Sequence, residues 1–224
     1  MGSLYFREWG KRNHLPSLVL LHGFLEDSRM WEHLVPHLSS QRHIVAVDLP
    51  AHGKSPLFQE VHTMEFMAAC VLETLDELGL ERVAMLGHSM GGYVVLAFAE
   101  AYPDRLDQFA LFYSTPEDDD PMKKQNRLRA TKLVKKHREL YIQNAIPLLF
   151  DPTMLEVHSD QIQAQIAMSL EMSSAGIIAA IKGMTSRPDR THLLENEPKE
   201  GHYRAHTVGF IAGRNTSTPA TVKK

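Results

Sequence analysis

The sequence predicts an α/β fold with a mostly parallel central sheet, helices on both faces of the sheet and a helical cap insertion. Two observations support this prediction. Short apolar runs rich in β-forming residues alternate with segments of helical periodicity, which is typical of a parallel sheet covered on both faces. After residue 115 the strand signal disappears and a long helical stretch follows. The expected strands are residues 4–9, 17–22, 43–48, 83–87, 109–114 and 207–213.

The helices between these strands have recognisable start signals. Asp27 or Ser28 is a suitable N-cap for a helix that reaches about residue 38. Thr63 is placed to cap a second helix that runs to about residue 78, and a third helix begins at Ser89 and ends before Pro103. Each of these helices connects two expected strands, as a parallel sheet requires.

The chain divides into three expected parts. Residues 1–115 form the first part of the core, residues 116–198 the helical cap, and residues 199–224 the last and incomplete part of the core. Acidic residues at 117–120 precede a basic run at 123–138, an order that suits the helix macrodipole, so we interpret these charges as a solvated helix face. Apolar residues at helical spacing near the end of the cap are interpreted first as core, with pocket lining as the alternative: Met168, Met172, Ile177, Ile178 and Ile181.

Composition narrows the class of protein. A chain of 224 residues with 43% hydrophobic residues can bury a sizeable core, and its net charge of −3 argues against nucleic acid or an anionic membrane as partner. The single cysteine, Cys70, fits a reducing compartment. The N-terminus carries charges where a secretory signal is apolar, and no apolar run approaches the roughly 18 residues of a membrane span. We therefore expect a cytoplasmic, soluble protein, and the sequence predicts no oligomeric state.

The segment LGHSMGGY, residues 86–93, contains the candidate nucleophile. An apolar strand at 83–86 is followed by a sharp glycine-containing turn around Ser89 and then by a helix. This strand-turn-helix context is the one that a nucleophile elbow requires, because the small neighbours relieve crowding while the turn exposes the serine. The alternative is a glycine-rich turn that merely packs tightly. We interpret Ser89 as the catalytic residue.

A second segment, LVLLHGF at residues 18–24, is an apolar strand that also ends in a turn. The backbone N–H groups of Phe24 and Met90 are the expected oxyanion hole, which would stabilise a tetrahedral intermediate formed on Ser89. His22 is interpreted as a residue that organises the loop. His88 is also set aside as the base, because its side chain is expected to point away from that of Ser89.

Three segments together carry a resemblance to a known family. LLHGF at 20–24, DLPAHGKS at 48–55 and GHSMGG at 87–92, in this order, resemble the α/β-hydrolase family, close to its small bacterial esterase, lactonase and peptidase-like members. Ala51 stands where relatives often have glycine. The resemblance spans residues 4–213 and implies a sheet of about eight strands, a helical cap after the sixth, and a catalytic triad in the chain order Ser, Asp or Glu, His.

The acid and the base of that triad are absent from their family positions. The segment 207–220 resembles the strand and turn that deliver the acid, but Asn215 is followed by Thr216 and no carboxylate follows Glu200. His202 and His206 precede this strand and do not match the family histidine. Some relatives take the acid from the preceding strand end, which would nominate Glu117 or Asp118. We expect a C-terminally shortened form of an active hydrolase, because residues 220–224 leave a layer of the fold half built.

The function predicted from these residues is hydrolysis of carboxylic esters by serine acyl transfer through Ser89, with a small-molecule ester as substrate. No metal or cofactor is expected, because the histidines lack an H-E-x-x-H spacing and no G-x-G-x-x-G follows a strand. Two alternatives remain. One is a carbon–carbon lyase like those that make menaquinone precursors in this fold, which cap arginines facing Ser89 would favour. The other is a pseudoenzyme that binds its ligand without catalysis.

Overall fold

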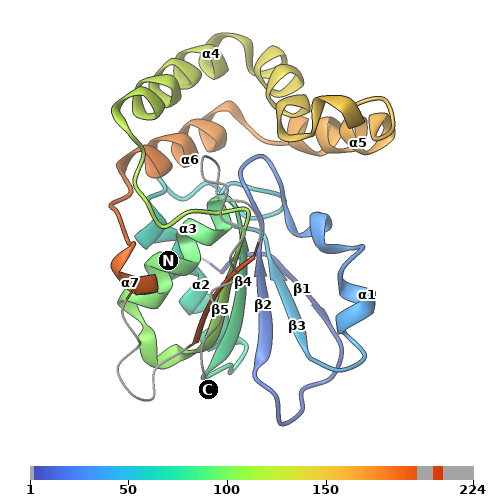
Figure 1. The fold of residues 1–224 in the computed structure, drawn as a ribbon, viewed down its shortest axis with the longest axis vertical. Helices are drawn as coiled ribbons and strands as arrows, with labels where there is room; N and C mark the ends of the chain where they lie inside the picture. The colour runs from blue at the N-terminus through green and yellow to red at the C-terminus, as the bar shows by residue number, and fades with distance from the viewer. Residues whose placement is uncertain (1–2, 196–203, 209–224) are drawn as a thin grey trace.

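A computed structural model describes residues 3–195 and 204–208 of the chain. Its centre is a six-stranded sheet with the order β1-β3-β2-β4-β5-β6 (Figure 1). Strand β1 is antiparallel to β3 and every other pair is parallel, which confirms the predicted mostly parallel sheet. The strands are β1 (Phe6–Trp9), β2 (Ser17–Leu21), β3 (Ile44–Val47), β4 (Val83–His88), β5 (Leu106–Phe112) and β6 (Arg204–Val208).

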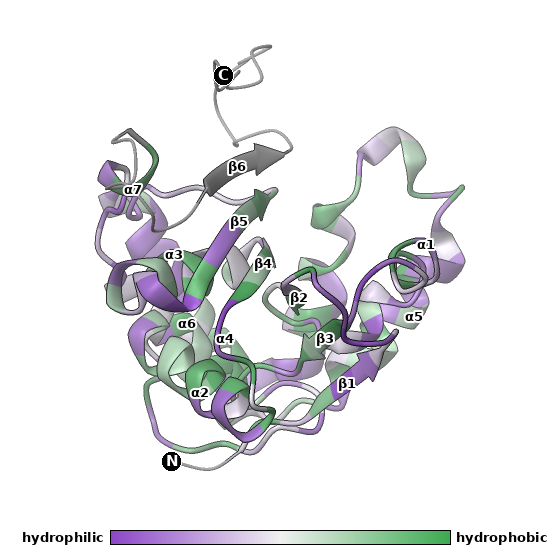
Figure 2. Cartoon of the chain, turned by 90° about the horizontal axis from the view of Figure 1, so that it is seen from below, coloured by the Kyte–Doolittle hydropathy of each residue, from purple (hydrophilic) through white to green (hydrophobic). Residues whose placement is uncertain are grey.

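Helices cover both faces of the sheet, as predicted (Figure 1). Alternate residues along β2 point to opposite faces: Val19 and Leu21 pack into the core beneath α2 and α3, whereas Leu20 packs against Trp31 and Val35 on the other side. The described helices that flank the sheet are η1 (Ser28–Trp31), α1 (Val35–Leu38), α2 (Met64–Glu77), α3 (Met90–Ala101) and η2 (Pro103–Arg105), and α7 (His192–Glu195) packs on α3. Figure 2 shows the edge strand β1 as largely hydrophilic, in agreement with its partly exposed residues.

A helical layer lies across the end of the sheet where the parallel strands finish (Figure 1). Helix α6 packs on the segment between β3 and α2, where Gly176 approaches Ala51 and Gly183 approaches His62, and α4 packs on α6. Ile177 and Ile181 of α6 are buried. Of the apolar residues expected near the end of the cap, these two and Met172 are core, as the first interpretation held. The helices of this layer are α4 (Pro121–Ala145), η3 (Pro147–Leu149), η4 (Pro152–Met154), α5 (Ser159–Leu170) and α6 (Ser174–Ser186). The cap boundaries at residues 116 and 198 remain predictions.

The structure corrects several element boundaries; the strand expected at 109–114, for example, spans Leu106–Phe112. The helix expected from about Asp27 to residue 38 is split into η1 and α1, because Pro36 has no N–H to bond to the carbonyl one turn earlier. The last strand, expected at 207–213, begins earlier, at Arg204, and residues 209–213 of the prediction lie outside the described residues. Within the described ranges, no single helix has both the length and the apolar character to cross a membrane, although the bent pair α5 and α6 meets those criteria jointly.

Candidate active site

Ser89 lies between the end of β4 and the start of α3, with backbone angles φ 49° and ψ −112°. A non-glycine residue with this φ is strained and persists only where the surroundings hold it. The Ser89 N–H donates to the Phe112 carbonyl at 3.0 Å, and the Ser89 carbonyl accepts a 2.8 Å hydrogen bond from the Ser114 hydroxyl. Its side chain makes no N-cap hydrogen bond. The backbone is therefore fixed by β5 and its continuation, while the hydroxyl faces the cavity described next.

The glycines around Ser89 are required by close packing of the backbone. A Cβ on Gly87 would lie 2.5 Å from the Gly91 carbonyl oxygen, and a Cβ on Gly91 would lie 2.4 Å from the carbonyl oxygen of Leu21 at the end of β2. Real Cβ atoms do not approach oxygen this closely, so neither position accepts a side chain without movement. The G-x-S-x-G pattern thus allows the turn to pack directly against β2.

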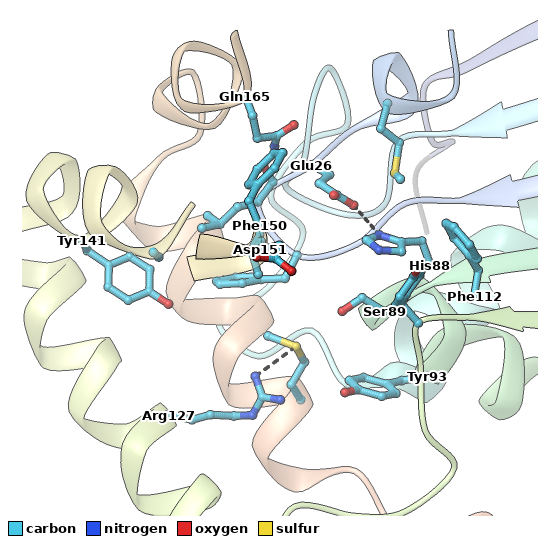
Figure 3. Close-up of a pocket in the computed structure, with 17 residues that line it drawn as sticks. Glu26, His88, Ser89, Tyr93, Phe112, Arg127, Tyr141, Phe150, Asp151 and Gln165 are labelled. Carbon is cyan, nitrogen blue, oxygen red and sulfur yellow. Dashed lines mark hydrogen bonds and ion pairs between the residues drawn. The ribbon is translucent and has the colours of Figure 1, made fainter. Parts of the chain in front are cut away.

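Ser89 opens into a cavity of about 860 Å³ between the sheet and the helical layer (Figure 3). The wall is formed mainly by aromatic and long side chains from both layers. The lining residues are Phe24, Leu25, Glu26, Met30, His88, Ser89, Tyr93, Phe112, Tyr113, Arg127, Tyr141, Ala145, Leu149, Phe150, Asp151, Gln165 and Met184. None of the five Met and Ile residues considered for pocket lining is among these described residues; the methionines that line it are Met30 and Met184.

The candidate oxyanion donors lie next to this turn. Phe24 lines the cavity, and Met90 is the first residue of α3, where N–H groups have no partner within the helix. Neither the Phe24 N–H nor the Met90 N–H donates a hydrogen bond to another residue in the described part of the chain. Their role as an oxyanion hole remains a prediction.

His22 uses both ring nitrogens to hold the loop that follows β2. Its Nδ1–H donates to the Gly23 carbonyl at 2.8 Å, and its Nε2 accepts from the Leu49 N–H at 2.8 Å. Burial lowers the pKa of His22, so that the ring is neutral near pH 7. With both nitrogens occupied, His22 acts as a structural residue, in agreement with its interpretation as a loop organiser.

The side chain of His88 lines the same cavity as Ser89, contrary to the expectation that it points away. Its Nδ1 lies 2.8 Å from Glu26 Oε2, and the ring packs against Phe112 (Figure 3). The same carboxylate oxygen accepts the Gly23 N–H at 2.6 Å. Glu26 was missed by sequence reasoning, although its place two residues after Phe24, in the same turn, was a usable signal.

The acidic run at 117–120 contains one buried carboxylate. Glu117 and Asp118, the two candidate triad acids, are exposed and do not line the cavity, and Asp118 pairs with Lys124 at 2.7 Å. Asp119 is instead 2% exposed and forms ion pairs with Arg127 and Arg187. The interpretation of all these charges as a solvated face is therefore wrong for Asp119. This carboxylate is buried because it pairs with Arg127 of α4 and with Arg187 at the end of α6.

The remaining candidate positions fall outside the described side chains. His202 and the turn that includes Asn215 and Thr216 lie outside the described residues, and only the backbone of His206 in β6 is described. In the described ranges, no group of three or more His, Cys, Asp or Glu side chains is arranged to hold a metal ion.

Comparisons with known proteins agree with this geometry. Residues 16–146 match the model of a family described as the alpha/beta hydrolase fold. A solved structure of a thermophilic esterase from Thermogutta terrifontis superposes with a TM-score of 0.80 at 31% identity, over 91% of this chain and 74% of the esterase.

Curated relatives resemble shorter stretches. Pimeloyl-[acyl-carrier protein] methyl ester esterase of Aeromonas hydrophila is 37% identical over 101 residues, which are 45% of this chain and 39% of that protein. Epoxide hydrolase 4 of Mus musculus is 33% identical over 93 residues, 41% of this chain and 26% of its own length. The match therefore spans well under half of each curated relative. Because the family model covers more than half of this sequence, the chain belongs to the alpha/beta hydrolase fold family.

Proposed function

We propose that this protein hydrolyses small carboxylic esters by acyl transfer to the Ser89 hydroxyl. The observation that carries the proposal is the strained backbone of Ser89, which presents its hydroxyl to a cavity of about 860 Å³ at the start of α3. In the proposed reaction, Ser89 Oγ bonds to the ester carbonyl carbon, the alcohol leaves, and water then releases the acid. The N–H groups of Phe24 and Met90 would stabilise the negative charge on the carbonyl oxygen.

The relatives support an ester as the substrate class. Two of the similar proteins are named esterases, one from Thermogutta terrifontis and one from Aeromonas hydrophila. The cavity also suits an ester of modest size, since aromatic side chains form much of its wall and polar side chains are interspersed among them. The cytoplasmic location remains a prediction from the sequence.

The lyase alternative is less well supported. It calls for several cap arginines that face Ser89, and Arg127 is the one cationic lysine or arginine side chain among the described residues that line the cavity. Binding without catalysis is favoured by one observation: among the described residues, no histidine ring is hydrogen-bonded to the Ser89 hydroxyl. That alternative keeps the same cavity and the same ligand class, and it differs only in the absence of turnover.

Prolonged incubation with excess fluorophosphonate, followed by peptide mass spectrometry, tests the nucleophile. We expect one adduct, located on Ser89, and no adduct on the Ser89→Ala variant. Ser159→Ala is a matched control, because Ser159 is an exposed serine on α5, outside the cavity lining. It should be labelled on Ser89 like the unaltered chain. An adduct at another residue, or none on Ser89 at long times, contradicts the proposal.

A further inference from the structure

Arg127 reaches from α4 into the cavity on the side opposite Ser89 (Figure 3). Its Nε–H donates to Asp119 Oδ2, and one Nη1–H points at the Met184 sulfur, at 3.3 Å. A guanidinium has five N–H donors, and a thioether is a weak acceptor. Within the described part of the chain, the other N–H groups of Arg127 make no hydrogen bond, so part of a permanently charged group faces the cavity.

Arg127 and its charged neighbours carry a net positive charge, because two arginines share one aspartate. Asp119 is shared by Arg127 and by Arg187, whose Nη1 lies 2.9 Å from Asp119 Oδ1. Burial raises the pKa of Asp119, but the hydrogen bonds and charges of both arginines outweigh it and hold the pKa below its usual value. One carboxylate therefore serves two guanidinium groups. Arg187 also stacks on the ring of Tyr93, which lines the cavity, at 3.9 Å.

Tyr141 adds a neutral donor on the same side of the cavity (Figure 3). Burial raises the pKa of Tyr141, with Arg127 acting in the opposite direction, so the hydroxyl keeps its proton at neutral pH. Two carboxylates are among the described residues that line the cavity, and neither pairs with Arg127. Glu26 contacts His88 and the Gly23 N–H, and the exposed Asp151 accepts hydrogen bonds from Thr153. An anion from solution can therefore pair with Arg127 without displacing a carboxylate in this lining.

We propose that Arg127, assisted by Tyr141, is a carboxylate-binding subsite, and that the preferred ligands are esters with a free carboxylate at the end remote from the ester group. The ester part of this statement rests on the proposed function; the carboxylate part rests on the cavity alone. A planar guanidinium binds a carboxylate through paired hydrogen bonds, and such charge-assisted bonds are stronger than neutral ones. The subsite would thus select half-esters of dicarboxylic acids over neutral esters of equal length.

Calorimetric titration with two matched ligands tests the subsite directly. Monomethyl adipate carries one carboxylate, and dimethyl adipate is its neutral counterpart of the same chain length. We expect the unaltered 224-residue chain to bind the half-ester about tenfold or more tightly, with the difference shrinking as salt is added. Equal affinity for the two ligands overturns the proposal, and this comparison needs no variant.

Variants then assign the preference to Arg127. Arg127→Gln should remove the preference for the half-ester, and Arg127→Lys should keep part of it. Arg129→Gln is the matched control, because Arg129 is an exposed arginine two residues further along α4 and does not line the cavity. It should bind like the unaltered chain. A preference that survives in a folded Arg127→Gln protein overturns the assignment. Because these are binding measurements, failure of Ser89 to react leaves them interpretable.

Discussion

Glu26 and His88 are joined by a 2.8 Å contact between Oε2 and Nδ1, which ties the turn after β2 to the last residue of β4. The two residues are 62 positions apart in the chain. Since the same Glu26 oxygen also holds the Gly23 N–H, the turn that carries Phe24 is fixed against the turn that carries Ser89. The position of Phe24 relative to Ser89 thus depends on the Glu26 carboxylate.

Removal of that carboxylate should destabilise the protein. Glu26→Ala leaves the partly buried Gly23 N–H and His88 Nδ1 without their acceptor, so we expect the free energy of unfolding to fall by about 1–3 kcal/mol. Urea denaturation measures this loss. Glu32→Gln is the control, because Glu32 forms an exposed pair with Arg7 and should cost less than about 1 kcal/mol. Equal losses in both variants would argue against the tie between the two turns.

Gly91→Ala tests the packing of the turn on β2. Alanine has a higher helix propensity than glycine by about 1 kcal/mol, so on propensity alone α3 would be stabilised. The added Cβ would lie 2.4 Å from the Leu21 carbonyl oxygen, and relief of that overlap requires backbone movement. We therefore expect a net loss of about 2 kcal/mol in thermal or chemical unfolding. Stabilisation by this substitution would contradict the close approach of α3 to β2.

Gly79→Ala is a useful comparison for that experiment. No atom lies within 4 Å of a Cβ at Gly79, but its φ is +63°. We expect Gly79→Ala to lower the free energy of unfolding by about 1–2 kcal/mol, because alanine is disfavoured in the left-handed conformation. No steric overlap adds to this cost. Activity should be unaffected by Gly79→Ala and reduced by Gly91→Ala, since Gly91 belongs to the turn that presents Ser89.

Ester turnover by the 224-residue chain should be weak. In the described part of the chain no histidine is hydrogen-bonded to Ser89, and loss of the base costs a serine hydrolase about 10⁶ in kcat. The residual rate should correspond to roughly 10³–10⁴ over water, the part due to binding and the oxyanion hole. Hydrolysis of p-nitrophenyl butyrate, with Ser89→Ala as the blank, measures it. Rapid turnover that depends on Ser89 would reveal a base, and His88→Gln would be the first variant to test.

Buried histidines should make the fold sensitive to mild acid. Burial lowers the pKa of His52 to about 3, with His22 adding to the effect, and burial also lowers the pKa values of His22 and His62. Below pH 6.5 the unfolded chain binds protons that the folded chain excludes, so this stability is present above pH 6.5 and is lost as the pH falls toward 3. For His52 the loss is roughly 1 kcal/mol per pH unit over this interval.

Urea midpoints between pH 7 and pH 5 check this prediction. His52→Gln should make the pH dependence shallower, because one excluded proton is removed. His14→Gln, at an exposed histidine, should leave the slope unchanged. An unfolding free energy that is constant over this pH interval would contradict the assignment of these rings as buried and neutral.

Asp119→Asn should strongly lower the free energy of unfolding. It leaves Arg187, whose side chain is 3% exposed, without its carboxylate, and removal of one member of a buried ion pair costs about 3–5 kcal/mol. Asp118→Asn is the adjacent control, since Asp118 pairs with Lys124 at the surface and should lose less than about 1 kcal/mol. Equal unfolding midpoints for the two variants would contradict the buried role of Asp119.

The sequence by itself determined the α/β class and the position of the Ser89 turn. Both depend on local rules: apolar strands and amphipathic helices have their own periodicities, and a sharp turn needs small residues on each side. Such patterns can be recognised in the sequence because each depends on only a few consecutive residues. The split of the first expected helix at Pro36 is a local effect too, and the sequence already contained its cause.

Only the tertiary structure decided which side chains meet. The approach of Glu26 to His88 and the shared use of Asp119 by Arg127 and Arg187 join residues from separate elements. Arg127 shows the reason most clearly. In the sequence it is one charge of a basic helix, and it faces the cavity only because α4 packs on α6 above the end of the sheet (Figure 1). Periodicity defines the faces of a helix, but packing determines what each face meets.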